Sequence, residues 1–424
     1  MRQVKCGQLA NGFRFYAQYD SRNNNVSGIG VKCGSIHDPP GQVGMAHFAE
    51  HNLVRESLKY PEQEVNSILE RYLGGLNGVD INVRTDRIST FYGHGDLLRR
   101  RHMFECFDLF ASLLGDKIIN KRGIGVESGA VHQEYYLYGL DFMPSLVEDL
   151  MHELVYIKNP ARNRIDCQPE DLRQITPNQV RRFARRHYTP SNMFAIMLGP
   201  KFEEVRERTK RLFDHWEGPE PPVLDYDGSD NFPMLREIKS AELTRNIHQY
   251  HVAIGFPTEP AGSKDDEVLE VISRVLSARL MQRLRGKNLD FNKGVYRALA
   301  FIPRSFVHGM IYCWFATSDK DFAKFGENVI LEEIKKLREE LVSDRERDDM
   351  VQSLDLIYLD AFQNVAEILC ELIIEAVCNG DEDLTQLHAY RDRLYRVSRR
   401  KIREVANKYF GANHARVVIG PSNL

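Results

Sequence analysis

The chain lacks the features that mark membrane, secreted and nucleic-acid-binding proteins. No stretch of its 424 residues reaches the roughly 18 apolar residues that span a bilayer, and its start, "MRQVKCGQLANGFRFY", has no apolar signal core. Basic and acidic side chains are nearly balanced, 57 against 60, and the densest basic runs, 99–102 and 181–187, fit solvated helix faces. We therefore expect a soluble protein that binds neither nucleic acid nor a membrane.

Closely spaced cysteine pairs are also missing. The seven cysteines are scattered along the chain with no CxxC spacing. An odd, scattered set argues for free thiols in a reducing compartment and against a cysteine-ligated zinc site. A cytoplasmic location is the expectation that follows.

The chain is longer than one hydrophobic core usually supports, so two or more domains are expected. An internal repeat agrees with this: "RRFARRHYTPSNMFAIMLGP" at 181–200 is similar to "REVANKYFGANHARVVIGPS" at 403–422. Each copy has the pattern of an amphipathic helix followed by an apolar strand, although chance similarity of such a pair is the alternative. The proline-rich, acidic segment 217–233 is typical of a linker, which predicts domains at 1–216 and 234–424.

Strand and helix patterns alternate within each half. Asn11-Gly12 separates two short apolar runs, which is a strong hairpin signal. Further strands are predicted at 26–34, 79–85, 88–94 and 246–256, with two more within 295–317. Helices are predicted at 43–58, in long stretches after residue 94 up to about 187, at 265–286 and through most of 320–407. Strand pairs with short turns and grouped helices favour an α+β fold of two similar domains, each a largely antiparallel sheet covered by helices.

The stretch "GMAHFAEHNLVRES" at 44–57 carries the clearest chemical signal. On a helix, His47, Glu50 and His51 share one face, because residues three and four positions apart are neighbours. Two imidazoles one turn apart can chelate zinc, and the carboxylate between them can act as a general base toward a zinc-bound water. The alternative is a chance spacing on an ordinary helix, so a third ligand is required.

Candidates for that ligand lie in "GIGVESGAVHQEYYLYG" at 123–139. Glu127 and Glu134 are two helical turns apart and therefore on one face. Either could complete the zinc sphere while the other orients a ligand from outside it. Both could equally lie on a solvated helix face, and spacing alone leaves these interpretations open.

The order H-x-x-E-H reverses the commoner H-E-x-x-H and marks the inverzincins. The chain resembles the pitrilysin-type zinc metallopeptidases, which include small bacterial zinc proteases and mitochondrial processing peptidase. The resemblance covers nearly the whole chain: "LANGFRFYAQ" is similar to the family's opening strand pair, and "GGLNGVDINVRTDRISTFY" to its glycine pair and polar strand. It implies two similar α+β domains that face each other across a cleft.

The resemblance also implies roles for single residues. His47, His51 and Glu134 would bind zinc, Glu127 would support them, and Glu50 would be the general base.

Arg285 and Tyr296 match best an arginine and a tyrosine of the family's second domain that hold the substrate and stabilise the oxyanion. The spacing between these two is longer here than in the family, and segment 157–167 also departs from the family pattern. An extended peptide would add a strand to a sheet edge near Asn82.

These features predict a zinc-dependent endopeptidase that cleaves peptides or short unfolded segments. A closed chamber in the family generally needs four domains, so a homodimer is expected. If the longer spacing displaces Arg285 or Tyr296, a heterodimer with a related chain becomes the better interpretation. Two rival functions are a non-catalytic subunit of such a peptidase and a dedicated protease that matures one precursor.

Overall fold

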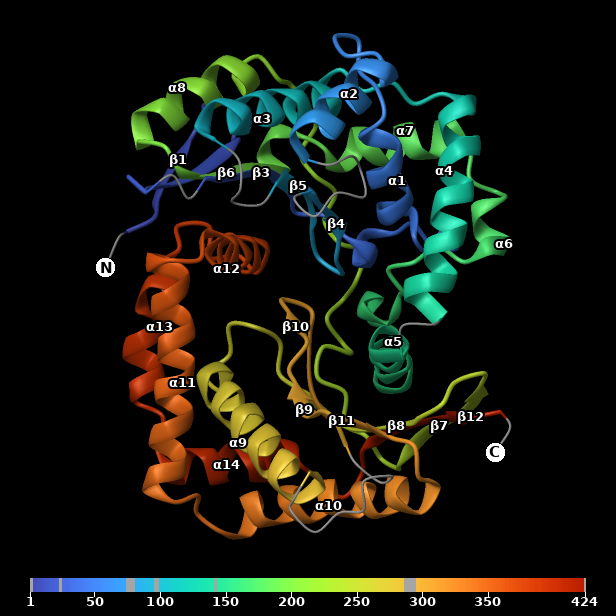
Figure 1. The fold of residues 1–424 in the computed structure, drawn as a ribbon, viewed down its shortest axis with the longest axis vertical. Helices are drawn as coiled ribbons and strands as arrows, with labels where there is room; N and C mark the ends of the chain where they lie inside the picture. The colour runs from blue at the N-terminus through green and yellow to red at the C-terminus, as the bar shows by residue number, and fades with distance from the viewer. Residues whose placement is uncertain are drawn as a thin grey trace. The chain divides into compact units, whose positions relative to one another are not determined.

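The computed structural model of the protein describes residues 3–22, 25–73, 81–94, 99–140, 143–285 and 295–422. The chain forms two compact units (Figure 1). Unit 1 comprises Met1–Gly139, Asn163–Asp225 and Tyr358–Leu387, whereas unit 2 comprises Leu140–Arg162, Tyr226–Ile357 and His388–Leu424. Among the described residues, no helix combines the length and apolar character needed to cross a membrane.

Unit 1 is built on a six-stranded sheet. In spatial order its strands are β1 (Lys5–Gln8), β2 (Arg14–Tyr19), β6 (Met193–Gly199), β3 (Val26–Val31), β5 (Thr90–His94) and β4 (Ile81–Thr85). β2 and β6 run parallel, and every other neighbouring pair is antiparallel. β4 therefore forms one edge of the sheet.

Helices cover both faces of this sheet. The core of the unit lies between one face and four helices, namely α1 (Met45–Leu53), α3 (Arg100–Gly115), α7 (Pro177–His187) and α8 (Phe202–Phe213). Three further helices flank these, α2 (Glu62–Leu73), α4 (Lys121–Glu134) and the short α6 (Pro169–Leu172). The other face packs against α12 (Ala366–Cys378), which contacts β3 and β6 (Figure 1).

Unit 2 has the same plan. Its strands in spatial order are β10 (Arg304–Ser305), β11 (His308–Thr317), β8 (Tyr250–Thr258), β12 (Ala415–Pro421) and β7 (Lys239–Arg245), and β9 (Ala298–Phe301) also pairs with β11. Only β12 and β7 run parallel among these described pairs. The core lies between one face and α9 (Asp266–Leu284), α10 (Lys320–Glu339) and α14 (Arg399–Tyr409), while α5 (Met143–Val155) packs against β7, β8 and β12.

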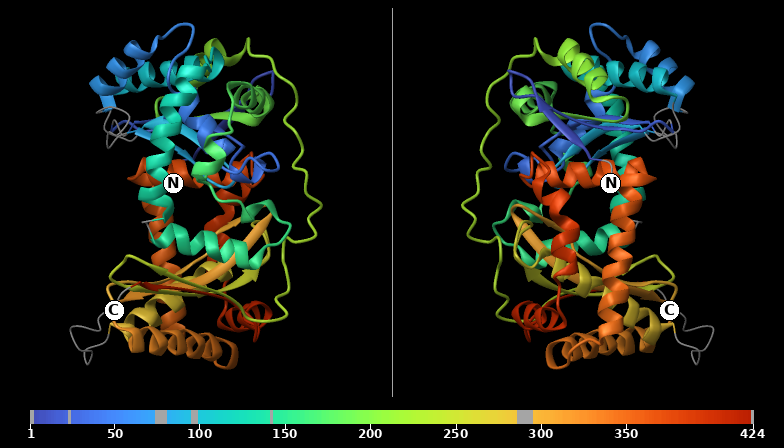
Figure 2. Two further views of the ribbon diagram at one scale, coloured as in Figure 1. Left: turned by 90° about the vertical axis from the view of Figure 1, so that its right-hand side faces the viewer. Right: turned by 90° about the vertical axis from the view of Figure 1, so that its left-hand side faces the viewer.

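The compact units differ from the predicted continuous domains 1–216 and 234–424. Residues 140–162, with α5, belong to unit 2, and residues 358–387, with α12, belong to unit 1. Packing explains the exchange, because each of these helices buries its apolar face on the sheet of the other half of the chain. The helices α11 (Asp344–Gln363) and α13 (Thr385–Tyr395) lead to and from α12. The predicted linker 217–233 has no helix or strand and runs as an extended chain, in yellow-green in Figure 2.

The predicted repeat is present in the structure. α7 leads into β6 and α14 leads into β12, and each of these strands lies between a parallel and an antiparallel neighbour. The hydroxyls of Thr176 and Ser398 accept hydrogen bonds from backbone N–H groups at the two helix starts. The predicted α+β fold of two similar units is confirmed. Three details differ: α1 ends at Leu53, short of residue 58, 295–317 contains three strands, and β7 was not predicted.

Candidate metal centre

Gly44 directly precedes helix α1 as its N-cap residue, and its φ of 83° lies in the left-handed region that favours glycine. The carboxylate of Asp38 accepts hydrogen bonds from the backbone N–H groups of Gly44 (2.7 Å) and Ala46 (2.8 Å) and so caps the helix. A Cβ atom at position 44 would lie 2.4 Å from the Cα atom of Cys167. Glycine therefore lets the segment around Cys167 pass beside the first turn of α1.

Two histidines of α1 and a glutamate of α4 converge in unit 1. The rings of His47 and His51 lie one helical turn apart, with centroids separated by 4.9 Å. Glu134 is the last residue of α4, and its Oε2 lies 3.1 Å from Nε2 of His51 and 3.4 Å from Nε2 of His47. One ligand atom from each residue lies within 4.8 Å of the other two, and no other such group occurs in the described part of the chain.

The spacing of these three side chains suits a zinc ion. Bonds of about 2.0–2.1 Å in a tetrahedral sphere place neighbouring ligand atoms about 3.3 Å apart. The carboxylate oxygen of Glu134 lies close to that distance, at 3.1 and 3.4 Å from the two imidazole nitrogens. Two imidazoles and one carboxylate are also a ligand set of catalytic zinc sites, which leave a fourth position for water.

Glu127 lies on the opposite side of the His51 ring from Glu134. Its Oε2 is 3.1 Å from Nδ1 of His51, and its Oε1 pairs with Arg55, which also pairs with Glu62. This contact orients the ring so that Nε2 faces Glu134. Burial would raise the pKa of Glu127, but hydrogen bonds from His51 and Arg55 outweigh burial and lower it.

Asp166 lies in a similar position beside His47, and no pattern in the sequence pointed to this residue. Its Oδ1 lies 3.4 Å from Nδ1 of His47, although that nitrogen makes no hydrogen bond in this geometry. Each of the two histidines therefore has a carboxylate on the side away from Glu134. Asp166 belongs to segment 157–167, and the signal that could have located it is the approach of Cys167 to Gly44, which is visible only in the fold.

Glu50 is buried beside the two histidines, with 5% of its surface exposed. Its Oε2 accepts a hydrogen bond of 2.9 Å from the hydroxyl of Thr85, on β4. That hydroxyl lies 3.2 Å from the hydroxyl of Thr90, which donates to the carbonyl of Cys33. Burial raises the pKa of Glu50, and the neighbouring histidines offset only part of the rise. A carboxyl group with a raised pKa is suited to take up and release a proton.

The carboxylates around the two imidazoles require a positive charge between them. Burial would raise the pKa of Glu134, but hydrogen bonds to the two histidines outweigh burial and hold it well below its usual range. Burial would likewise lower the pKa of His51, yet its hydrogen bonds to Glu127 and Glu134 raise it to about 10. Either a proton on His51 or a metal ion can supply that charge, so metal binding would release a proton.

The remaining predicted residues lie elsewhere. Arg285, just after α9, and Tyr296, before β9, belong to unit 2, and both are exposed, Tyr296 by 72%. The guanidinium carbon of Arg285 lies 5.9 Å from the centre of the Tyr296 ring, and residues 286–294 between them lie outside the described chain. Asn82 lies in the edge strand β4, where its backbone pairs with Gly93, and its side chain is outside the described part.

Two family models match consecutive parts of the chain. The model described as insulinase (peptidase family M16) matches residues 15–168, and the model described as peptidase M16 inactive domain matches residues 174–354. The first of these ranges contains His47, His51 and Glu134. The metal cluster therefore lies wholly within the part of the chain that matches the insulinase model.

Curated proteins and solved structures give similar matches. The chain is 20% identical over 428 residues to the uncharacterized zinc protease YmxG of Bacillus subtilis, covering 99% of this chain and 98% of that protein. It is 24% identical over 204 residues to the probable zinc protease PqqL of Haemophilus influenzae, covering 46% of this chain and 21% of that longer protein. A protease from Helicobacter pylori superposes with a TM-score of 0.87 at 17% identity, covering 99% of this chain and 100% of that chain, which shows a shared fold.

Proposed function

Because the chain belongs to the M16 family of peptidases, we propose that it is a zinc-dependent endopeptidase with its metal at His47, His51 and Glu134. The observation that carries the proposal is the convergence of one ligand atom from each of these residues within 4.8 Å. Buried Glu50 lies next to this cluster on α1. The geometry supports a site that activates water against a peptide bond.

In this proposal the side chains divide the chemical work. Zinc, when bound, polarises the scissile carbonyl and acidifies a water molecule. Glu50 takes up the proton from that water and later delivers it to the leaving amine. The hydroxyl of Thr85 holds one oxygen of the Glu50 carboxyl group, which keeps the carboxyl group in place. Glu127 orients the His51 ring by a hydrogen bond, and the carboxylate of Asp166 lies 3.4 Å from Nδ1 of His47 on the corresponding side of the other ring.

The substrate is proposed to be a peptide or a short unfolded segment. The edge strand β4 offers backbone groups to which an extended peptide can add as a further strand near Asn82. Arg285 and Tyr296 are proposed to hold the substrate and to stabilise the oxyanion. Both side chains are exposed, and the guanidinium of Arg285 lies near the ring of Tyr296, so the two can contact a substrate together.

The assembly and the location are also proposals. We propose a homodimer that forms an enclosed chamber, since each chain carries both the metal cluster and an Arg/Tyr pair. A heterodimer with a related chain is the alternative. The cysteines, none of which forms a disulfide in the described chain, support a reducing compartment such as the cytoplasm.

The decisive experiment compares the native chain with Glu50→Gln. Zinc content is measured together with cleavage of a quenched, unstructured peptide. About one zinc per chain in both proteins, with cleavage only by the native chain, is the expected result. Removal of zinc by a chelator should abolish cleavage, and added zinc should restore it.

The other outcomes separate the rival functions. Zinc in both proteins with cleavage in neither would favour a non-catalytic subunit or a missing partner chain. Cleavage of one precursor but of no generic peptide would favour a dedicated maturation protease. A native chain that binds no zinc would overturn the proposal.

A further inference from the structure

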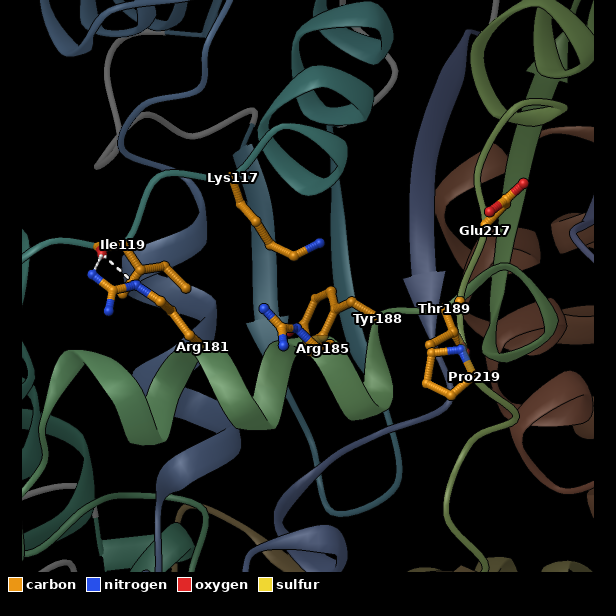
Figure 3. Close-up of a pocket in the computed structure, with 9 residues that line it drawn as sticks. Lys117, Ile119, Arg181, Arg185, Tyr188, Thr189, Glu217 and Pro219 are labelled. Atoms are coloured by element: carbon orange, nitrogen blue, oxygen red, sulfur yellow. Dashed lines mark hydrogen bonds between the residues drawn. The ribbon is translucent and has the colours of Figure 1, made fainter.

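A second candidate site lies in unit 1, apart from the metal cluster. A cavity of about 300 Å³ opens at the carboxyl end of α7 (Figure 3). Its lining includes Lys117, Arg181, Arg185, Tyr188, Thr189 and Glu217. None of these residues takes part in the proposed zinc chemistry, so the cavity requires an explanation of its own.

Three of the lining side chains are cations. The ammonium of Lys117 donates a hydrogen bond of 2.7 Å to the carbonyl of Leu114. Arg181 directs Nε and one Nη to the carbonyl of Ile119, at 3.0 and 2.6 Å, and is thereby fixed in the wall (Figure 3). Arg185 has no hydrogen bond or ion pair with any residue that the structure describes. None of these three cations therefore forms an ion pair with an acidic residue that the structure describes.

The cations are poorly compensated. Burial, together with the charge of Arg185, lowers the pKa of Lys117 to about 8, and Asp116 offsets only part of this effect. Glu217 is the acidic lining residue, but it forms no ion pair with the cations in the described structure. The hydroxyl of Thr189 is shielded from solvent and has no hydrogen-bond partner there. The wall thus holds the half-buried ammonium of Lys117 and the exposed guanidinium of Arg185, and neither charge is paired with an acidic group in the described structure.

We propose that this cavity binds a small anion that carries a phosphate or carboxylate group. Ammonium and guanidinium groups form their strongest hydrogen bonds with such anions. The volume is at the lower end for small-molecule pockets. The ring of Tyr188, whose hydroxyl is 2.7 Å from the hydroxyl of Tyr92, forms a fixed wall beside the cations. Ile119 and Pro219 add apolar surface for the remainder of a small organic anion.

The test is a titration of the full-length, zinc-loaded protein with inorganic phosphate and, separately, with acetate. Chloride at the same ionic strength is the reference, and binding is followed by calorimetry and by the thermal midpoint. The variants are Arg185→Gln and Lys117→Gln. Arg182→Gln is the matched control, because Arg182 is exposed on the same helix but does not line the cavity. A His51→Gln protein distinguishes this site from phosphate binding at the metal centre.

The expected result is binding of one anion per chain with a rise in the thermal midpoint. Binding should weaken roughly 10- to 100-fold in each cavity variant and remain unchanged in Arg182→Gln and His51→Gln. Binding of phosphate but not acetate would identify the phosphate class, and the reverse would identify the carboxylate class. No binding at millimolar anion, or equal weakening in Arg182→Gln, would overturn the proposal. Since Arg185 is exposed, its variant should fold even if Lys117→Gln does not.

Discussion

Helices α1 and α9 occupy the same place in the two repeats but carry different chemistry. α1 contacts β4, β5 and α7, and α9 makes the matching contacts with β9, β11 and α14. α1 presents His47, His51 and Glu50, whereas α9 fills its buried face mainly with valine, leucine and isoleucine. The same position in the fold therefore accepts both an apolar helix and one that carries metal-ligating side chains.

The charged groups of the two helices differ in their partners. On α9, Arg279 pairs with Glu346 and Arg283 pairs with Glu333, so cations and carboxylates neutralise each other. Around α1, the carboxylates of Glu127 and Glu134 meet an imidazole. Within the described chain, Glu134 has two imidazoles and no guanidinium or ammonium as partners, and only unit 1 brings two imidazoles and a carboxylate together in this way.

The largest expected effect comes from His51→Gln. We expect loss of bound zinc and a fall of cleavage to background, because two remaining ligands do not hold a catalytic zinc. The matched control on the other helix is Arg274→Gln, an exposed position of α9, which should keep both zinc and activity. Metal analysis and peptide cleavage measure both. If His51→Gln retained its zinc and its turnover, the contrast between the helices would have no functional meaning.

Tyr296→Phe tests whether unit 2 takes part in the chemistry. Loss of one oxyanion donor lowers kcat by roughly 10- to 1,000-fold, and we expect this fall with zinc content unchanged. Single-turnover kinetics with a quenched peptide would measure it. Unchanged kcat would show that the exposed Tyr296 is not that donor, and that unit 2 contributes no oxyanion contact through it.

The two repeats also differ at the end of their matching helices, where α7 has His187 and α14 has Tyr409. Burial lowers the pKa of His187 to about 3 and that of His37, whose ring lies 5.6 Å away, to about 4. An unfolded histidine titrates near 6.5, so the unfolded chain takes up these protons first as the pH falls. His187 should therefore cost unit 1 on the order of 3 kcal/mol of stability between about pH 6.5 and 4.

His187→Phe should remove that part of the acid sensitivity, because phenylalanine does not titrate. Urea unfolding followed by tryptophan fluorescence can report each unit separately. Trp216 packs on the core of unit 1, and Trp314 lies in β11 of unit 2. Both proteins carry Trp314→Phe, so that Trp216 alone reports on unit 1. On acidification, the urea midpoint of unit 1 should fall less in the protein with His187→Phe than in the protein that keeps His187. An unchanged pH slope would assign the acid sensitivity to other groups.

The smallest effect is expected for Asp166→Asn. Loss of a carboxylate behind a metal-binding imidazole typically weakens metal affinity about 10- to 100-fold. Competition with a chelator measures the zinc affinity. Asp171→Asn serves as the control, since Asp171 lies in α6 and forms no ion pair with either histidine in the described structure. Equal zinc affinity of the native and Asp166→Asn proteins would remove Asp166 from the site.

Local patterns predicted the parts of the site that lie on single helices. The spacing of His47 and His51 predicts that both lie on one face of α1. The seven-residue spacing of Glu127 and Glu134 likewise predicts that these two share one helix face. Asp166 could not be found this way, because its approach to His47 depends on how a loop passes Gly44. The basic run at 181–187 is predicted to be a solvated face, and its four arginines are exposed. Spacing did not show that two of them, Arg181 and Arg185, also line a cavity.

The sequence alone also could not predict that α5 and α12 each pack on the sheet of the other half of the chain. Amphipathic periodicity shows that α5 and α12 each bury one face, but it does not show on which sheet. The apolar stripe of α12 would fit either sheet by composition. The choice depends on contacts far apart in the chain, such as the ion pairs of Glu382 with Arg14 (2.9 Å) and Lys32 (2.6 Å).

This exchange sets the order in which a growing polypeptide can mature on the ribosome. The sheet of unit 1 is complete once β6 has been synthesised, but the helix that covers its second face, α12, is translated after most of unit 2. Until then the face formed by β3 and β6 is left without its own cover. A nascent chain of this architecture therefore needs either a chaperone or rapid completion of synthesis to protect its first sheet from aggregation.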